Sequence, residues 1–328
     1  MALNVFQSGR AALEVTRGTD LTPTRLIYFE QAVHEQTVAT IRPSEHRNSY
    51  EPVYSSSAGP ETNTLQLSGR VTYDDLIWYA NLFFKGVASG TGAGADKTWT
   101  FTPTNSSDDV KTATVQLGYS DTIATAPGIK LNYVFGRSLN LHFEKNDDGA
   151  ATFQADFLAA KALTQITAFT GSLSDRTVTF ASCNNTQVYI DATTIGTTAD
   201  ANVVSVDYTL NLDPVPFYTL DGTTAANSIQ RPNWRNWTAT IVRQYANDNE
   251  FDRYVDKAVR KIRVRTTGPA LGGSNYKIDL DMYGVHTARS WSDVDGIITE
   301  TLTFEPVFDT TTSTSSSLVV VNATASIT

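Results

Sequence analysis

Two neighbouring segments in the middle of the chain alternate strictly between apolar and polar residues. Their apolar positions are Leu139, Leu141 and Phe143 in the first segment and Phe153, Ala155 and Phe157 in the second. The sequence Asn-Asp-Asp-Gly at 146–149 separates the two segments. A period of two on both sides of an Asp-Gly turn is typical of a β-hairpin with one buried face. We therefore predict an antiparallel hairpin over residues 138–159.

A similar pattern recurs near the end of the chain. Asp295-Gly296 is followed by the segment IITETLTFEPVFD, which also alternates. Gly149 and Gly296 are 147 residues apart, and the same separation relates Phe157 to Phe304. A repeated spacing of this kind indicates an internal duplication.

Two further segments carry the signals of a short helix. Thr72 precedes two aspartates and an apolar run with helical spacing that begins at Leu76 and stops before Gly86. The second segment begins at Asn249, and its apolar positions continue as far as Ile262. We expect each helix to place one apolar face against a sheet.

The predicted elements follow the same order in both halves: strand, polar loop, strand, capped helix, further strands and a terminal hairpin. The polar loops cover 42–63 and 213–236. This order predicts a mainly β fold of two tandem β-sandwich or barrel domains, residues 1–168 and 169–328, each with one short flanking α-helix. One large β-sandwich is the alternative. The polar run 310–317 and the β-branched segment after it suggest either a C-terminal arm that joins a neighbour's sheet or a frayed terminus.

Composition narrows the possible functions. The 328 residues carry a net charge of −9, which is shared by both halves and argues against tight nucleic-acid binding. The chain has one cysteine, Cys183, so it forms no internal disulfide, which fits a reducing compartment. We expect no signal peptide, because the first residues lack a basic segment followed by an apolar run, and no membrane span.

No catalytic or metal-binding pattern emerges from the sequence. The four histidines lack metal-site spacing, and the glycine-rich segment 89–95 lacks the Lys-Ser/Thr of a phosphate-binding loop. Hairpin turns explain the aspartates at 147–148 and 293–295 more simply than calcium does. We therefore expect neither an enzyme nor a cofactor. The basic residues Arg253, Lys257, Arg260 and Lys261 form either a solvated face or a surface that meets an acidic patch of another copy.

These features together resemble the major tail tube proteins of long-tailed, non-contractile bacteriophages. The resemblance is carried by FQSGRAALEVTRGTDLTPTRLIYF near the N-terminus, by GRSLNLHFEKNDDGAATFQADFLA, and by DGIITETLTFEPVFD. It implies a structural protein of the virion tail, made in the host bacterial cytoplasm. It also implies self-assembly into stacked rings, trimeric with pseudo-sixfold symmetry if both domains are tube domains and hexameric otherwise. Tail terminator, tape measure and baseplate or tip proteins would be its partners, and DNA would pass through the lumen without specific binding.

The resemblance also implies roles for particular residues. The lumen-facing candidates are Glu144, Asp147, Asp148, Gln154, Asp156, Asp293, Asp295, Thr299, Thr301 and Thr303. The candidates for contacts between rings are Arg42, Glu45, Arg47, Tyr50, Tyr54, Arg231, Trp234 and Arg235. An alternative function is a β-sandwich virion decoration or carbohydrate-binding adhesin module, in which Tyr218, Trp234, Trp237 and Trp291 form a sugar platform.

Overall fold

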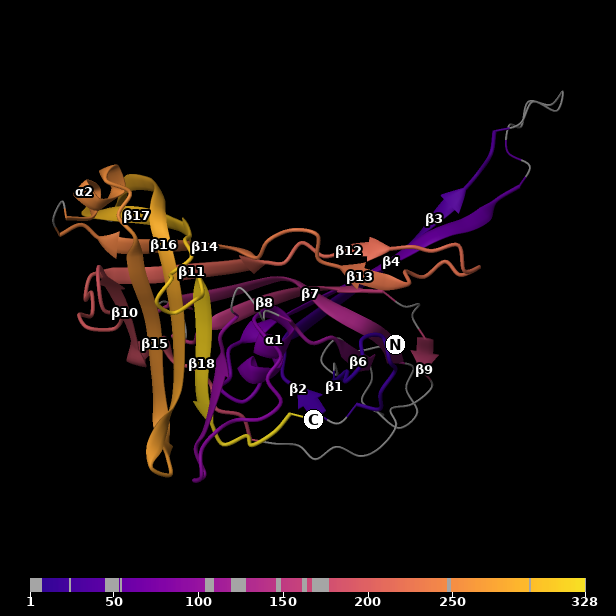
Figure 1. Ribbon diagram of the computed structural model, residues 1–328, viewed down its shortest axis with the longest axis horizontal. Helices are drawn as coiled ribbons and strands as arrows, with labels where there is room; N and C mark the ends of the chain where they lie inside the picture. The colour runs from indigo at the N-terminus through magenta and orange to yellow at the C-terminus, as the bar shows by residue number, and fades with distance from the viewer. Residues whose placement is uncertain are drawn as a thin grey trace.

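The computed structural model describes residues 8–23, 25–44, 53, 55–103, 109–118, 128–145, 149–160, 164–166, 177–246, 249–294 and 296–327. Most of the elements belong to one large antiparallel sheet, which confirms the mainly β prediction. Figure 1 shows a long β-hairpin projecting at one end of the longest axis and a short helix at the other end.

The described elements follow one another in chain order. In the first half they are β1 (Ser8–Leu13), β2 (Arg25–Ile27), β3 (Gln31–Ile41), β4 (Ser57–Arg70), α1 (Leu76–Phe83), β5 (Lys97–Phe101), β6 (Ala113–Gly118), β7 (Gly128–Glu144), β8 (Thr152–Ala159) and β9 (Thr164–Ile166). In the second half they are the 3₁₀ turn η1 (Cys183–Asn185), β10 (Thr186–Asp191), β11 (Val203–Asn211), β12 (Val215–Phe217), β13 (Ser228–Gln230), β14 (Asn236–Gln244), α2 (Asn249–Val255), β15 (Arg260–Leu271), β16 (Ser274–Val294), β17 (Ile297–Pro306) and β18 (Ser316–Asn322).

The strands of the two halves pair in the same succession. In the first half the order is β3-β4-β8-β7-β6-β1, and in the second half it is β11-β14-β17-β16-β15-β10. Both predicted hairpins are present, as β7–β8 and β16–β17. Each hairpin has a register shift at the same point, opposite Phe157 in one and Phe304 in the other. The turn glycines Gly149 and Gly296 both have positive φ, 67° and 80°, which favours glycine because it lacks a Cβ.

Two ladders join the halves. Residues 138–144 of β7 pair with residues 205–211 of β11, which makes the two series of strands continuous. The C-terminal strand β18 pairs with β16 and with β5 of the first half. The prediction of a C-terminal arm is therefore wrong for this segment, because its backbone hydrogen bonds are made within its own chain.

The core lies on one side of the sheet, around α1. Every residue of this helix is buried, so the expected amphipathic, flanking helix is instead surrounded by protein. Tyr79 packs against Phe153 with ring centroids 4.6 Å apart, and Phe83 lies 5.4 Å from Phe157. The helix begins after a turn in which the Asp75 N–H donates to Thr72 Oγ1 over 3.1 Å. The hydroxyl expected as a cap therefore fixes the entry to the helix from three residues before it.

The second helix differs from its prediction in length. α2 ends at Val255, and Lys257 adopts a left-handed φ of 51°, which helical continuation does not allow. Ile262 instead lies in β15 as a fully buried strand residue. Over so short a segment the apolar positions fit both a helical period of 3.6 and a strand period of two, so the sequence pattern did not distinguish helix from strand.

The polar loops also contain more strand than predicted. Residues 57–63 of the predicted loop belong instead to β4 and extend the β3–β4 hairpin. Within 213–236, β12 and β13 form a small separate sheet. Both segments have the backbone hydrogen bonds of strands although their side chains are mostly polar or small.

The contact between α1 and β7 generates a stability prediction. A Cβ at Gly136 would lie 2.7 Å from the Leu82 carbonyl oxygen and 2.7 Å from Phe83 Cε1. We expect Gly136→Ala to lower the free energy of unfolding by about 1–3 kcal/mol, because the helix and strand must separate to admit it. The control is Gly273→Ala, since nothing lies within 4 Å of that Cβ position. Chemical denaturation measures both, and equal stabilities would contradict the prediction.

Candidate functional site

One face of the sheet is polar across eight consecutive strands from both halves. Their order is β3-β4-β8-β7-β11-β14-β17-β16, and all seven pairings are antiparallel. Because cross-strand partners point to the same side of a sheet, the registers give the members of this face. Examples from each strand are Glu35, Gln66, Gln154, Asn140, Thr209, Thr240, Thr301 and Ser290. The opposite face holds the core positions, such as Leu141, Phe157, Ile241 and Leu302.

Hydrogen bonds link neighbouring strands along this polar face. Asp156 accepts from Gln66 Nε2 at 2.8 Å and from the Ser138 hydroxyl at 2.7 Å, so it connects β4, β8 and β7. Asn140 donates to the Thr209 hydroxyl over 2.9 Å, across the ladder that joins the halves. These bonds connect polar side chains of neighbouring strands to one another across the face.

A second contact across the same ladder carries charge. His142 Nδ1 lies 2.7 Å from Asp207 Oδ1, and its Nε2 lies 3.2 Å from Glu144 Oε2. Carboxylates therefore outnumber cations on the face. The in-register ionised residues are the carboxylates Glu35, Glu144, Asp156, Asp207 and Glu305, with Arg70 as the cation. The remainder is largely hydroxyl and amide, so the face is neutral to acidic.

The structure places the described lumen candidates as follows. Glu144, Gln154, Asp156, Thr299, Thr301 and Thr303 all lie in register on the polar face. Asp293 is the exception, because it pairs with Ile298 on the other side of the β16–β17 hairpin. Its carboxylate accepts from the Gly296 N–H at 2.8 Å and so stabilises the turn. Asp147, Asp148 and Asp295 lie outside the described residues.

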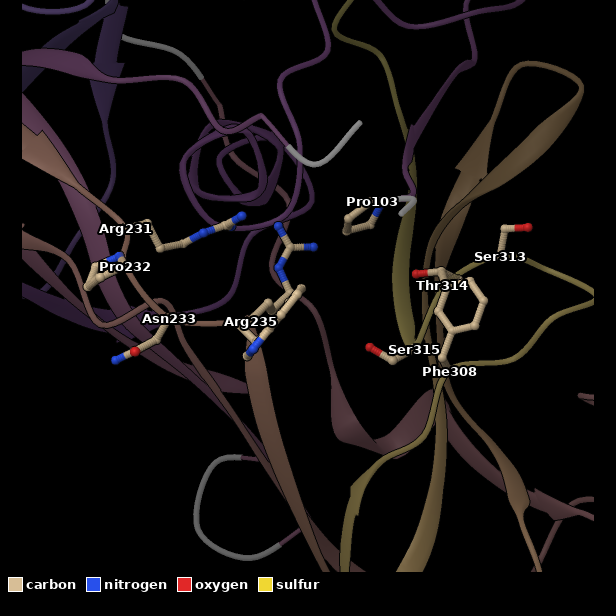
Figure 2. Close-up of a pocket in the computed structure, with 10 residues that line it drawn as sticks. Pro103, Arg231, Pro232, Asn233, Arg235, Phe308, Ser313, Thr314 and Ser315 are labelled. Atoms are coloured by element: carbon tan, nitrogen blue, oxygen red, sulfur yellow. The ribbon is translucent and has the colours of Figure 1, made fainter. Parts of the chain in front are cut away.

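Three of the residues expected to contact another ring lie together. Arg231, Trp234 and Arg235 line one side of a cavity of about 510 Å³, and Figure 2 shows the two arginines facing Pro103, Phe308 and Ser313–Ser315 across it. Trp234 is 93% exposed. Arg235 donates to the Phe84 carbonyl at the end of α1, which anchors the start of β14 against the first half. Arg42 is exposed beyond β3, whereas Glu45, Arg47, Tyr50 and Tyr54 lie outside the described residues.

The predicted basic face is largely neutralised within the chain. Arg260 is 2% exposed and lies 3.0 Å from Glu250, so it cannot belong to a surface. Arg253 binds the same carboxylate at 2.7 Å, and Lys261 lies 3.5 Å from Asp309. Lys257 donates to the His286 carbonyl at 3.1 Å. Three of these four basic residues thus form ion pairs within the chain and Lys257 binds a backbone carbonyl, and the prediction was wrong for Arg260.

Sequence reasoning missed an exposed apolar surface around α2. It comprises Phe251, Val255, Trp291 and Ile298, with exposures of 45%, 60%, 62% and 56%. The alternation around Asp295-Gly296 gave no signal for it, because Trp291 and Ile298 occupy positions where a core residue is expected. A contiguous exposed apolar surface is a common feature of interaction sites.

Two searches of the described residues, for a metal-binding cluster and for a membrane-spanning helix, found neither. Within them, no three His, Cys, Asp or Glu side chains converge as a metal site would require. No helix in the described ranges is both long and apolar enough to cross a bilayer. Searches of protein-family models and of curated proteins find no match to this chain.

The ion cluster beneath α2 yields a prediction on pH. Burial alone would raise the pKa of Glu250, but the hydrogen bond with His286 and the charges of Arg260 and Arg253 outweigh it and lower the pKa to about 2. Since the folded pKa lies below the usual 4.5, the stabilisation is complete above that pH and is lost as the pH falls towards 2. We expect Glu250→Gln to flatten this part of the stability–pH profile.

The same substitution should destabilise the protein at neutral pH by roughly 3–5 kcal/mol, because Arg260 is left buried without its counter-charge. Asp252→Asn is the matched control, since it removes one exposed carboxylate from the same helix. Urea titrations between pH 2.5 and pH 7 measure both effects. Parallel profiles for wild type and Glu250→Gln would overturn the assignment.

Proposed function

We propose that this protein is a structural subunit that assembles into stacked rings and forms the tail tube of a long-tailed bacteriophage. The observation that carries the proposal is the eight-stranded sheet with one polar face, built from two identical successions of strands. A tube wall needs a sheet that continues from subunit to subunit, with one face towards the lumen and the other packed on a core.

We infer that the two successions are tandem tail-tube-like domains, residues 1–168 and 169–328. The equal pairing order, the matching register shifts in both hairpins and the two turn glycines support this duplication. Each domain contributes four strands to the polar face. Three chains would then supply six domains to a ring. A ring of six chains would contain twice as many strands around its circumference.

The chemistry of the polar face suits a conduit for DNA. Phosphates bind to lysine and arginine, and binding strength grows with the number of such contacts. A wall of hydroxyl, amide and carboxylate groups offers few of them and repels the backbone at short range. We propose that DNA passes this surface without specific binding, and that the chain acts as a structural protein in the virion tail, not as an enzyme.

The remaining partners follow from the same proposal. A tail terminator would end the stack, a tape measure protein would occupy the lumen before ejection, and baseplate or tip proteins would begin the stack. The segments 42–63 and 213–236, which the sequence predicts as polar loops, are the proposed contacts between rings. The chain would be synthesised in the host bacterial cytoplasm.

The adhesin alternative loses its aromatic platform. Trp237 is fully buried, and the Tyr218 hydroxyl donates to the Glu61 carbonyl at 2.8 Å. Trp234 lies just before the start of β14. Trp291 pairs with Glu300 of β17, which pairs with Arg243 near the end of β14, so the two tryptophans lie at opposite ends of that strand. A stacking surface for a sugar needs aromatic rings close together, which these positions do not provide.

Negative-stain electron microscopy of the purified protein tests the proposal. We expect rings or tubes whose rotational average shows six similar lobes, with three chains per ring by native mass spectrometry. Monodisperse single chains at micromolar concentration, in the presence or absence of salt, would refute the tube.

The lumen assignment has its own test. Thr209→Lys and Thr301→Lys add positive charge to the polar face, and Leu220→Lys adds it at a fully exposed position outside that face. We expect assemblies of the first two variants to retain double-stranded DNA at low salt and to release it as salt rises. Wild type and Leu220→Lys should retain none. Equal retention by all three variants would contradict the assignment.

A further inference from the structure

The ladder between β7 and β11 joins the two halves of the chain and has a defined register. In it, Ser138 pairs with Asn211, Asn140 with Thr209 and His142 with Asp207. The pairing is antiparallel. β7 belongs to the first succession of strands, and β11 opens the second.

Registers elsewhere in the sheet show which residues of the two halves are equivalent. His142 pairs with Thr152 in the first hairpin, and Ser292 pairs with Thr299 in the second, so residues 138–142 of β7 correspond to residues 288–292 of β16. His34 pairs with Leu65, which pairs with Phe157, while Tyr208 pairs with Ala239, which pairs with Phe304. Residues 207–211 of β11 therefore correspond to residues 33–37 of β3.

The two segments that correspond to the internal ladder, residues 33–37 and residues 288–292, lie at opposite ends of the eight-stranded sheet. β3 begins the order and β16 ends it. In the described part of the chain, no strand pairs with residues 33–37 on the side away from β4, or with residues 288–292 on the side away from β17. Backbone groups on such edges are templates for another strand.

Side-chain burial distinguishes the joined half from the open half. In β7, Leu141 is fully buried opposite Tyr208 of β11. Its equivalent in β16 is Trp291, which is 62% exposed. The helices differ in the same way, since α1 is wholly buried but Phe251 and Val255 of α2 are 45% and 60% exposed. The second half therefore buries the apolar side chains of the first half, but in the described part of the chain no segment buries the equivalent side chains of the second half.

We propose that the missing cover is a second copy of this chain, whose β3 residues 33–37 pair antiparallel with β16 residues 288–292. The register repeats that of the internal ladder, so that Glu35 lies opposite Ser290 and His34 opposite Trp291. This inference rests on the proposed ring assembly and specifies its joint. Because the two edges differ, the contact is heterologous, and repeating it generates a ring if the rotation closes.

Disulfide trapping tests this register. Glu35→Cys with Ser290→Cys places two cysteines directly opposite each other, at the positions equivalent to Thr209 and Asn140, whose side chains are in contact. The matched control is Thr37→Cys with Ser292→Cys, an equally exposed pair that the register separates by about 13 Å along the strands. The native Cys183 is 2% exposed, and wild type shows its background.

Assemblies of each variant are confirmed by microscopy and then oxidised with diamide. We expect the first pair to give dimers and trimers on a non-reducing gel and the control pair to give at least ten-fold less cross-linked product. Mixing the single variants Glu35→Cys and Ser290→Cys should give dimers only, because each chain then carries one new thiol. Efficient trapping of the control pair, or of neither pair in intact rings, would overturn the joint while the proposed tube stands.

Hydrogen exchange on the unmodified protein keeps the test independent of the cysteines. We expect amides within 33–37 and 288–292 to become protected in assembled rings relative to dissociated chains. Unchanged exchange in both segments within rings would refute this joint. Absence of any ring from wild type would instead refute the proposed function.

Discussion

The backbone hydrogen bonds between β7 and β11 are the interaction on which the rest of this structure depends. They convert two similar sets of strands into one sheet, and so they create a polar face wider than either half could form. The register between the halves is strongly specified, because a slip of one residue would put Leu141 and Tyr208 on opposite faces and move one of them from the core to the polar face. The width and continuity of the polar face follow from this ladder.

The same ladder explains why α1 is buried on every side. Tyr208 of β11 lies 6.3 Å from Phe84 at the end of the helix and 6.0 Å from Trp237 of β14, so the second half closes over the first. Burying a large apolar side chain contributes roughly 1.5–3 kcal/mol, and this helix contains several. A single half without its neighbour would therefore expose the centre of its own core.

The amino-acid sequence predicted the local elements well where a short-range signal was complete. Alternation around Asp-Gly turns gave both hairpins, and helical spacing after Thr72 gave α1. Strand order could not be predicted from the sequence. β7 pairs with β11, which lies about 65 residues away along the chain, and a period-two pattern does not indicate which strand is the partner. The clearest local error, the length of α2, arose where helical and strand periods overlap.

The candidate site was predicted in the same uneven way. Alternation placed Glu144, Gln154 and Thr301 on the correct side of their strands, since the core residues between them set the face. It misplaced Asp293, because the residues next to a hairpin turn lack the core neighbours that distinguish the two faces. It could not separate Arg260 from its basic neighbours, since charge in a sequence does not reveal whether a counter-charge such as Glu250 is buried beside it.

Among the described strands, β3 and β16 each present an unpaired edge at an end of the polar face, and such edges must avoid pairing in unwanted ways. The exposed segment of β3 is polar, and antiparallel pairing of two copies centred on Glu35 would set like charges opposite each other, which is unfavourable. The edge of β16 instead presents Trp291 beside the apolar surface of α2. Pairing β3 with itself leaves that apolar surface in water, whereas the proposed pairing of β3 with β16 would place a second chain beside it. Pairing of β3 with a second β3 is thereby disfavoured relative to the proposed pairing of β3 with β16.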